Sequence, residues 1–305
     1  MKHLLSDFDL TEEHVDEILT LAIEIKSNPK KFETALKGKI LAMVFQKPST
    51  RTNASFQSAA YQMGGNVIYL DNNNSQIGRG ESLKETAKIL SGYTNFIVAR
   101  LNHQKDLEEM AEVSKVPVIN ALTDLYHPCQ ILADLLTIKE KKGELTGLKL
   151  AYFGDGGNNI ANSLLIACSK VGMDVVIACP KNEEYSPNNN ILQKAKEQST
   201  STITITSDPL KAAENVDILY TDTWISMGME KEKEARVTDF KAYQINQAIV
   251  NKAKKDCIVM HCLPAYVGYE ITEELLHGKQ SVVYQQAENR LHVQKALLFW
   301  LQKDL

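Results

Sequence analysis

The chain has 305 residues, of which 44% are hydrophobic and 24% are charged, and its formal net charge is −4. At roughly 150 residues per domain, this length predicts two domains, and the apolar content excludes disorder as the main state. The slightly acidic balance disfavours a large nucleic-acid footprint, which requires a basic face. A membrane span is also not expected, because no apolar run reaches the roughly 20 residues that it needs.

Two further features indicate where such a protein works. The start of the sequence turns acidic almost at once, and it lacks the long apolar stretch of a signal peptide and the Arg and Ser bias of a transit peptide. The five cysteines are an odd number without CxxC spacing, which disfavours a disulfide scaffold and a zinc ribbon. They are Cys129, Cys168, Cys179, Cys257 and Cys262. We therefore expect a cytoplasmic, enzyme-sized protein with reduced thiols.

Predicted helices and strands alternate along the first half of the chain. Residues 11–26 form an amphipathic helical pattern with Thr11 as the expected N-cap. The apolar run 40–45 is typical of a buried parallel strand. Further strands are predicted over 66–70, 96–99 and 116–120, and helices from about residue 50, over 82–90, over 105–114 and from Pro128 to about residue 141.

A second alternating series follows a polar stretch, 141–147, that two glycines interrupt. Strands are predicted over 149–153, 174–178, 202–206, 218–221 and 258–260, with helices between them, including 160–171, and a final helix over about 287–301. Two successive βαβα series predict an α/β protein with two doubly wound parallel sheets and a cleft between the domains. We place the domains at 1–142 and 143–286, with ligands bound beyond the carboxyl ends of the strands.

The segment from Lys47 to Thr52 joins a predicted buried strand to a helix. Ser49, Thr50, Arg51 and the free backbone N–H groups of the helix start form an anion site, for which phosphate is the natural ligand. A helix cap with a solvated arginine is the simpler alternative for the hydroxyl residues alone. The position directly after a buried strand favours the anion site.

Two more polar clusters follow predicted strands. His127 precedes the helix that begins at Pro128; a neutral histidine there can donate to a carbonyl oxygen, and Gln130 can hold an amide. The alternative is a satisfied core histidine. The loop 154–159 resembles a dinucleotide loop but lacks the third glycine of GxGxxG, where Asn159 stands. Two adjacent asparagines at a helix start suit the backbone of an amino acid better.

Three clusters lie in the last third of the chain. Asp222 leaves a predicted strand into a loop with Trp, Met and Gly, where it can face an ammonium group or cap a helix. Cys262 follows the strand at 258–260, and a buried, inert thiol is the alternative there. Arg290 lies at the head of the final predicted helix, where an ordinary surface arginine is the alternative.

In this order, the clusters closely resemble the motifs of the ornithine carbamoyltransferases, and the resemblance covers essentially the whole chain. The motifs are Ser49-Thr50-Arg51-Thr52, His127-Pro128-Cys129-Gln130, Asp222-Thr223-Trp224-Ile225-Ser226-Met227-Gly228, His261-Cys262-Leu263-Pro264 and Ala287-Glu288-Asn289-Arg290. The first two mark carbamoyltransferases generally, whereas the Ser-Met-Gly and His-Cys-Leu-Pro segments point to ornithine as acceptor. Putrescine-specific relatives usually have Thr at the position of Cys129, and aspartate carbamoyltransferases lack the two acceptor segments.

The resemblance implies a reaction of carbamoyl phosphate with L-ornithine that gives L-citrulline and phosphate. It also implies that carbamoyl phosphate binds first, on the first domain, and that the final helix, 287–305, returns to that domain. The residues implied to bind it are Ser49, Thr50, Arg51, Thr52, Gln76, Arg100, His127, Gln130 and Arg290. Preorganised donors there would stabilise the negative charge that develops on the carbonyl oxygen in the transition state.

The resemblance places ornithine on the second domain. The residues implied to bind it are Asn159, Asp222, Ser226, Met227, Cys262 and Leu263, and those implied to be catalytic are Arg51, Arg100, His127, Gln130, Asp222 and Cys262. Cys262 and Leu263 would lie beside the attacking δ-amine, which has to lose its proton; Cys262 is not expected to be a covalent nucleophile. The Leu263–Pro264 bond is expected to be cis. Neither a metal nor an organic cofactor is expected.

The resemblance also implies a homotrimer, or an assembly of trimers, with active sites at the subunit boundaries. The loop 75–82 matches one that reaches into the neighbour's site, with Gln76 near the phosphate. Two residues depart from the family pattern. Asn53 stands where an arginine is usual, which we expect to affect local support or subunit contacts more than chemistry, and Val267 stands where a basic residue is frequent.

Three rival functions remain open from the sequence. The nearest is a carbamoyltransferase for putrescine or another amine. A nicotinamide-dependent oxidoreductase is suggested only by Gly154-Asp155-Gly156, and a non-catalytic binding paralogue only by Asn53. Carbamoylation assays with ornithine and with putrescine, and a titration with NAD, distinguish these possibilities.

Overall fold

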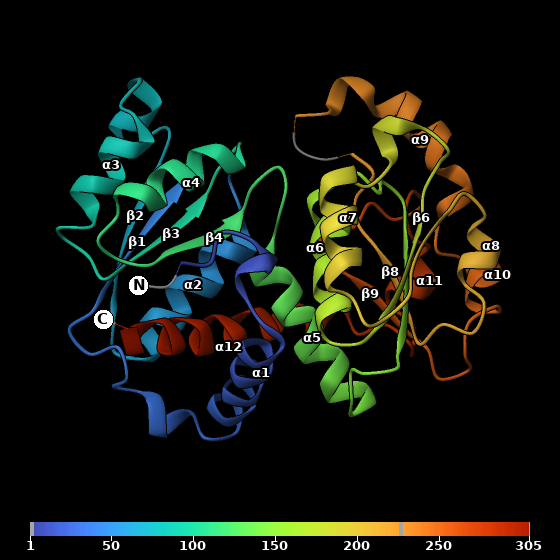
Figure 1. The fold of residues 1–305 in the computed structure, drawn as a ribbon, viewed down its shortest axis with the longest axis horizontal. Helices are drawn as coiled ribbons and strands as arrows, with labels where there is room; N and C mark the ends of the chain where they lie inside the picture. The colour runs from blue at the N-terminus through green and yellow to red at the C-terminus, as the bar shows by residue number, and fades with distance from the viewer. Residues whose placement is uncertain (1–2, 226–227, 305) are drawn as a thin grey trace. The chain divides into compact units, whose positions relative to one another are not determined.

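The structure, a computed structural model, describes residues 3–225 and 228–304. The chain divides into two compact units: unit 1 contains residues up to 136 together with those from 288 onward, and unit 2 contains residues 137–287. Each unit is a parallel sheet covered by helices (Figure 1). This confirms the predicted fold class of two parallel-sheet α/β domains. Within the described ranges, no helix has both the length and the apolar character that a membrane span needs.

Unit 1 has a four-stranded parallel sheet in the order β2-β1-β3-β4. Its strands are β1 (Ile40–Phe45), β2 (Asn66–Asp71), β3 (Phe96–Arg100) and β4 (Val118–Leu122); its helices are α1 (Glu12–Ser27), α2 (Thr50–Gln62), α3 (Leu83–Leu90) and α4 (Gln104–Val113), with the short 3₁₀ helices η1 (Asp7–Asp9), η2 (Pro29–Phe32) and η3 (Gln76–Arg79). In Figure 1, α3 and α4 cover one face of this sheet, and α2 and α12 (Val283–Leu301) cover the other.

The core of unit 1 follows from strands that are apolar on both faces. Alternate residues of β1 and β3, such as Ala42, Val44 and Ile97, pack against Leu107 and Met110 of α4, and all five are fully buried. Parallel strands covered on both sides by helices read as continuous apolar runs, which is why residues 40–45 predict β1 with its observed bounds.

The final helix packs within unit 1 from residue 288 onward, as expected. Lys26 Nζ on α1 donates a hydrogen bond to Asn289 Oδ1 at 2.8 Å, and Trp300 Nε1 donates to Glu17 Oε2 at 2.8 Å. These bonds connect both ends of the residue 288–301 segment of α12 to α1. From residue 288 onward, the last helix in the sequence is therefore part of the first unit.

Unit 2 has a five-stranded parallel sheet in the order β7-β6-β5-β8-β9. Its strands are β5 (Lys149–Phe153), β6 (Asp174–Ala178), β7 (Ile203–Thr206), β8 (Ile218–Thr221) and β9 (Ile258–His261); its helices are α6 (Asn159–Lys170), α7 (Asn189–Gln198), α8 (Pro209–Ala212), α9 (Lys233–Phe240), α10 (Gln247–Val250) and α11 (Glu273–Leu276), with the 3₁₀ helices η4 (Glu183–Tyr185), η5 (Glu230–Glu232) and η6 (Lys241–Tyr243). Figure 1 shows α6 and α7 on one face of the sheet and α8, α10 and α11 on the other. The chain enters unit 2 along α5 (Pro128–Lys142), leaves it along α12, and ends with η7 (Gln302–Asp304).

In each sheet the strand order reverses once, between β1 and β3 in unit 1 and between β5 and β8 in unit 2. Open α/β sheets bind ligands outside the carboxyl ends of the strands at such a point. In unit 1, β1 leads directly to the segment 46–52, and β3 ends at Arg100. In unit 2, β5 leads to the loop 154–159, and β8 leads to Asp222. The topology thus brings the predicted residues of each unit to the edge of its sheet where ligands are expected.

The final helix begins about one turn earlier than predicted, at Val283 instead of residue 287. Residues 283–286 contain neither glycine nor proline, so nothing in the sequence stops the helix there. The backbone N–H of Gln286 donates to Val282 O at 2.8 Å and closes the first turn. Arg290 therefore lies inside the helix and not at its head.

The strand β4 begins two residues later than predicted, at Val118 instead of Val116. Pro117 has no N–H group and cannot donate to a neighbouring strand. Its carbonyl oxygen still accepts a hydrogen bond from Ile97 N–H at 2.9 Å. The regular ladder with β3 therefore starts only after the proline.

Candidate functional site

The start of α2 has the geometry of an anion site. Ser49 is the N-cap, and its Oγ accepts a hydrogen bond from Thr52 N–H at 3.2 Å. Thr50 is exposed and Arg51 is half-buried, so both side chains are accessible beside the first backbone N–H groups of the helix. Free N–H groups and the positive end of the helix dipole favour a bound anion at this position.

Arg100 and His127 reach the same edge of the unit 1 sheet from β3 and from the residue before α5. The pairing of β3 with β4 shifts register between Ala99 and Arg100, and an irregularity of this kind re-aims a side chain. Both side chains are buried, at 7% and 5% exposure. Burial, followed by the charges of Arg290 and Arg100, holds the pKa of His127 well below its ordinary value. The imidazole is therefore neutral and has one N–H group to donate.

Arg290 is the centre of a buried hydrogen-bond network in unit 1. Its Nη1 donates to Gln130 Oε1 at 2.7 Å, and its Nη2 donates to Thr52 Oγ1 at 2.8 Å. Because Arg290 is only 3% exposed, the alternative of an ordinary surface arginine is wrong. The network joins three motifs that are far apart in the sequence.

The orientation of the Gln130 amide is defined on both sides. While its oxygen accepts from Arg290, its Nε2 donates to Asp134 Oδ1 at 2.8 Å. Asp134 is fully buried and is absent from the predicted set of site residues. Its signal in the sequence is the i, i+4 spacing from Gln130 on one helix, at which glutamine and aspartate side chains pair.

Gln76 and Asn53 are not part of this network. Gln76 is exposed in η3, and among the described residues no hydrogen bond joins its side chain to Arg290, Thr52 or Gln130. Asn53 accepts a hydrogen bond from Gln57 Nε2 on the next turn of α2. The asparagine that departs from the family pattern therefore supports its own helix.

In unit 2, Asp222 is the centre of the candidate acceptor cluster. It is 8% exposed, and its Oδ1 accepts hydrogen bonds from Thr223 N–H at 2.7 Å and from the thiol of Cys262 at 2.9 Å. Its Oδ2 accepts a longer bond from Asn158 Nδ2 at 3.4 Å. The structure thus brings together residues that follow β5, β8 and β9. The Cys262 side chain is only partly buried, so the alternative of a buried, inert thiol is wrong.

Two of the other predicted acceptor residues are described by the structure, and two are not. Asn159 is half-buried at the first position of α6, and Leu263 is half-buried directly after Cys262. The Leu263–Pro264 bond is cis, as expected. Ser226 and Met227 lie outside the described residues. Asn158, which precedes Asn159, is the asparagine whose side chain contacts Asp222; the N-cap position that it occupies is the signal that would identify it.

Tyr152 adds a buried phenol to the acceptor cluster. Its hydroxyl oxygen accepts a hydrogen bond from Asn158 Nδ2 at 2.8 Å. Burial, followed by the negative charge of Asp222, raises the pKa of Tyr152 well above its ordinary value. The phenol is therefore protonated at neutral pH. Nothing in the sequence distinguishes this residue from an ordinary core tyrosine of β5.

Arg236 holds two loops of the acceptor cluster together. Its Nε donates to Trp224 O at 2.6 Å, and its Nη2 forms an ion pair with Asp155. The guanidinium carbon lies 5.2 Å and 5.3 Å from the ring centroids of Tyr185 and Phe240. Arg236 is only 1% exposed, so it is a structural clamp between the loop after β5 and the loop after β8.

The glycines after β5 accommodate the protein's own backbone. A Cβ atom added to Gly156 would lie 2.8 Å from Tyr185 O, and one added to Gly157 would lie 2.9 Å from Glu184 O. In a dinucleotide-binding loop, the corresponding space lets the backbone approach a pyrophosphate. Because residues 183–186 take that space here, the loop does not favour a nicotinamide cofactor.

Three side chains of this cluster belong to types that bind metals. Asp222, His261 and Cys262 each offer a ligand atom, and these atoms lie within 4.8 Å of one another. However, His261 Nδ1 already accepts from Leu263 N–H at 2.8 Å, and His261 Nε2 lies 3.1 Å from Glu270 Oε1. Both imidazole nitrogens and the thiol are thus engaged within the protein, so these residues do not form a vacant set of metal ligands.

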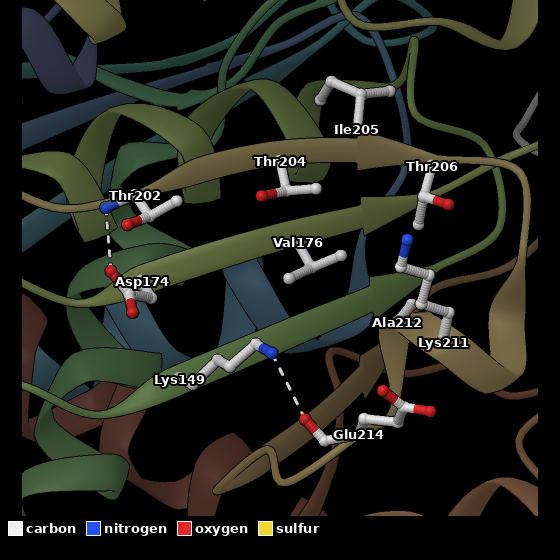
Figure 2. A pocket seen from close by; sticks show the side chains of 10 residues that line it. All are labelled: Lys149, Asp174, Val176, Thr202, Thr204, Ile205, Thr206, Lys211, Ala212 and Glu214. Atoms are coloured by element: carbon white, nitrogen blue, oxygen red, sulfur yellow. Dashed lines mark hydrogen bonds between the residues drawn. The ribbon is translucent and has the colours of Figure 1, made fainter.

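A separate pocket of about 400 Å³ lies over the strands β5, β6 and β7 of unit 2, beside α8 (Figure 2). It includes Lys149 and Asp174, the first residues of β5 and β6, and Thr202, which precedes β7. Lys149 Nζ donates to Glu214 O at 3.2 Å, and Thr202 N–H donates to Asp174 Oδ1 at 2.7 Å. None of the predicted site residues lines this pocket, so it is distinct from the acceptor cluster.

Comparisons with known proteins identify a family with two domains. Residues 2–140 match the carbamoyl-P binding domain of aspartate/ornithine carbamoyltransferases, and residues 146–301 match the Asp/Orn binding domain of the same family. The chain is 51% identical over 299 residues to the ornithine carbamoyltransferase of Methanocaldococcus jannaschii, covering 97% of each chain.

Two solved structures are similar along the whole chain. The ornithine carbamoyltransferase from Pyrococcus furiosus has a TM-score of 0.93 and 45% identity, with 100% of this chain and 98% of that chain covered. The anabolic ornithine carbamoyltransferase from Campylobacter jejuni has a TM-score of 0.94 and 40% identity, with both chains covered completely. By its motifs, its fold and these similarities, the chain belongs to the aspartate/ornithine carbamoyltransferase family.

Proposed function

We propose that this protein transfers the carbamoyl group of carbamoyl phosphate to the δ-amine of L-ornithine, giving L-citrulline and phosphate. The observation that carries the proposal is the buried Arg290, which binds both Thr52 and Gln130 and so gathers three carbamoyltransferase motifs at one edge of a sheet. The relatives described above are named for ornithine, which favours it over putrescine as the acceptor.

Carbamoyl phosphate would bind to unit 1. The start of α2, with Ser49, Thr50, Arg51 and Thr52, would bind the phosphate through hydroxyl groups, a guanidinium and backbone N–H groups. Arg100, His127 and Gln130 would surround the carbamoyl group. The neutral His127 can donate to the carbonyl oxygen, where negative charge develops in the tetrahedral transition state, and the buried arginines add to this stabilisation.

Ornithine would bind to unit 2. Asn159, Asp222, Ser226 and Met227 would contact its α-amino and α-carboxylate groups, and Cys262 and Leu263 would lie beside the δ-amine. That amine has to lose a proton before it can attack, and the Asp222 carboxylate beside Cys262 offers an acceptor. Because the Cys262 thiol donates to Asp222, its proton is retained, which is consistent with a role other than covalent nucleophile.

We also propose domain roles, an oligomeric state and a cellular location for the enzyme. Residues 1–142 together with residues 287–305 would be the carbamoyl phosphate domain, and residues 143–286 the ornithine domain. The enzyme would be a cytoplasmic homotrimer, or a multiple of trimers, of arginine metabolism, and would use no metal or organic cofactor. The exposed position of Gln76 supports a role for its loop in the site of a neighbouring subunit.

A panel of acceptors tests this function. Phosphate release from carbamoyl phosphate is measured with ornithine, putrescine and aspartate, each over a range of concentrations. The proposal requires the highest kcat/KM with ornithine. A preference for putrescine would support the nearest rival, and no release with any acceptor would support a non-catalytic paralogue. Titration with NAD, read by calorimetry, should give no binding heat.

A further inference from the structure

His261 ends β9 and directly precedes Cys262, yet the proposed chemistry gives it no role. Its side chain is fully buried. Its backbone N–H donates to Gln286 Oε1 at 3.0 Å, and the amide nitrogen of Gln286 donates to the hydroxyl of Tyr220 at 3.2 Å. The main chain of His261 is therefore held in place at the end of β9, where the turn over residues 261–263 begins.

Both ring nitrogens of His261 have defined partners. The backbone N–H of Leu263 lies 2.8 Å from Nδ1, and because this group can only donate, Nδ1 is the unprotonated nitrogen. A neutral imidazole then carries its proton on Nε2, which lies 3.1 Å from Glu270 Oε1 and donates to it. Glu270 is also fully buried, and the same oxygen accepts from Tyr266 N–H. These contacts select one tautomer and one orientation of the ring.

The turn that follows depends on this ring. Leu263 has φ 57°, in the left-handed region that residues other than glycine rarely adopt, so the surrounding contacts have to hold it there. The bond from Leu263 N–H to His261 Nδ1 closes the turn over residues 261–263. Between these two residues lies Cys262, whose sulfur is 2.9 Å from Asp222 Oδ1.

We infer that His261, oriented by Glu270, is a positioning residue that holds the 261–263 turn in place for the acceptor, and that it is not the proton acceptor for the amine. This inference rests on the proposed function for the identity of the acceptor. A general base needs a free lone pair within reach of the proton that it takes. The lone pair of Nδ1 already accepts from Leu263, and Nε2 directs its proton at Glu270.

Three variants separate positioning from proton transfer. In E270Q, the amide oxygen can accept the same two hydrogen bonds as the carboxylate, without its charge. In H261N, the side-chain oxygen can close the turn in place of Nδ1, as asparagine does in an Asx turn. In H261Q, the longer side chain places its amide group near the position of Nε2, where it can donate to Glu270. No acceptor then remains at the position of Nδ1 for the Leu263 N–H group in the buried turn.

The expected kinetics follow from the hydrogen bond to Leu263. E270Q and H261N should keep kcat within about threefold of the wild type, whereas H261Q should lower kcat/KM for ornithine by about 10- to 100-fold. The KM for carbamoyl phosphate should change by less than about twofold in all three, and the acidic limb of the pH profile of kcat should stay where it is in the wild type. A shifted limb in E270Q, or equal losses in H261N and H261Q, would overturn the inference.

A second readout does not depend on catalysis. Of the five cysteines, four are buried and Cys262 is partly exposed, so iodoacetamide should label Cys262 first, as followed by peptide mass spectrometry. H261Q should change this labelling rate, and E270Q and H261N should not. An unchanged rate in H261Q together with unchanged ornithine kinetics would overturn the inference.

Gln280→Ala is the matched control at the other end of β9. Gln280 Nε2 donates to Cys257 O at 3.1 Å, so its loss should lower stability without changing Cys262 labelling or ornithine kinetics. If Q280A changed both as H261Q does, the effects would be those of stability alone and the inference would fail. Should no variant, nor the wild type, carbamoylate ornithine, the proposed function fails while the labelling still decides the role of His261.

Discussion

Arg290 and Gln130 are 160 residues apart in the sequence, yet Arg290 Nη1 lies 2.7 Å from Gln130 Oε1. The contact connects the last helix to the first turn of α5, within unit 1. Because Gln130 also donates to Asp134, the arginine and the amide hold each other in one arrangement. The proposed carbamoyl phosphate site therefore depends on a residue of the last helix.

Arg290→Lys should weaken the binding of carbamoyl phosphate. Lysine has no planar fork and cannot donate to both Gln130 and Thr52 in the same geometry, so buried acceptors lose their partners. We expect the KM for carbamoyl phosphate to rise by about 10- to 100-fold, with a smaller effect on the KM for ornithine. Steady-state kinetics with each substrate varied in turn measure this. Lys303→Gln, at an exposed position in η7, is the control and should change neither KM. If Arg290→Lys raised both KM values equally, the assignment of Arg290 to the carbamoyl phosphate site would be wrong.

Asp222→Asn should mainly damage the use of ornithine. The amide can still accept from Thr223 and Cys262, but it no longer offers a charge to an ammonium group or a base to the amine. A hydrogen bond to a charged group is worth about 1.5–3 kcal/mol, so kcat/KM for ornithine should fall by about 10- to 100-fold or more. Carbamoyl phosphate binding, followed by calorimetry, should barely change. Asp256→Asn, which alters an exposed carboxylate of the same unit, should leave both parameters intact.

The buried His127 should make stability depend on pH in a defined direction. Its pKa is lowered in the folded protein, first by burial and then by Arg290 and Arg100, so folding favours the neutral form. The resulting stabilisation is complete above the ordinary histidine pKa of about 6.5 and is lost as the pH falls below it, by up to about 1.4 kcal/mol per pH unit.

Urea unfolding at pH 7.5 and pH 5.5 tests the direction in which the free energy of unfolding changes with pH. The wild type should lose more stability between the two values than His127→Asn does, because the variant has no imidazole to protonate. His277→Asn, at an exposed histidine, should show the wild-type dependence. If His127→Asn had the same pH dependence as the wild type, the claim that the fold favours a neutral His127 would be wrong.

Subunit complementation tests the proposed shared sites. Arg51→Ala and a loop variant at Gln76, each inactive alone, are dissociated, mixed in equal amounts and reassembled. In a cyclic trimer every mixed assembly contains one boundary at which an intact Arg51 meets an intact loop, so about a quarter of wild-type activity should return. No recovery, despite subunit exchange shown by mass spectrometry, would place complete sites within single chains.

The sequence predicted the sheets well because parallel strands covered on both faces read as unbroken apolar runs. The predicted bounds of β1, β5, β6 and β8 match the structure, and the misplaced start of β4 is explained by Pro117. The positions of the site segments were predictable for a related reason. Polar residues directly after buried strands can only lie at the carboxyl edge of a parallel sheet.

Other parts of the site depend on tertiary packing that no local pattern encodes. Arg236 and Asp155 are 81 residues apart, and each alone reads as an ordinary polar residue. Tyr152 reads as a core residue of β5, and the pairing of His261 with Glu270 depends on how the turn after β9 folds back. The start of the last helix was missed because neither glycine nor proline nor a cap marks it.

The fate of the carbamoyl carbon tests the proposed transfer to ornithine most directly. Carbamoyl phosphate labelled with ¹³C is incubated with the protein and an equimolar mixture of ornithine and putrescine, and the products are identified by NMR and mass spectrometry. We expect the labelled carbon in citrulline, bonded to the δ-nitrogen, together with an equal amount of phosphate. Label in carbamoylputrescine in preference to citrulline, or phosphate release without transfer to either amine, would contradict it.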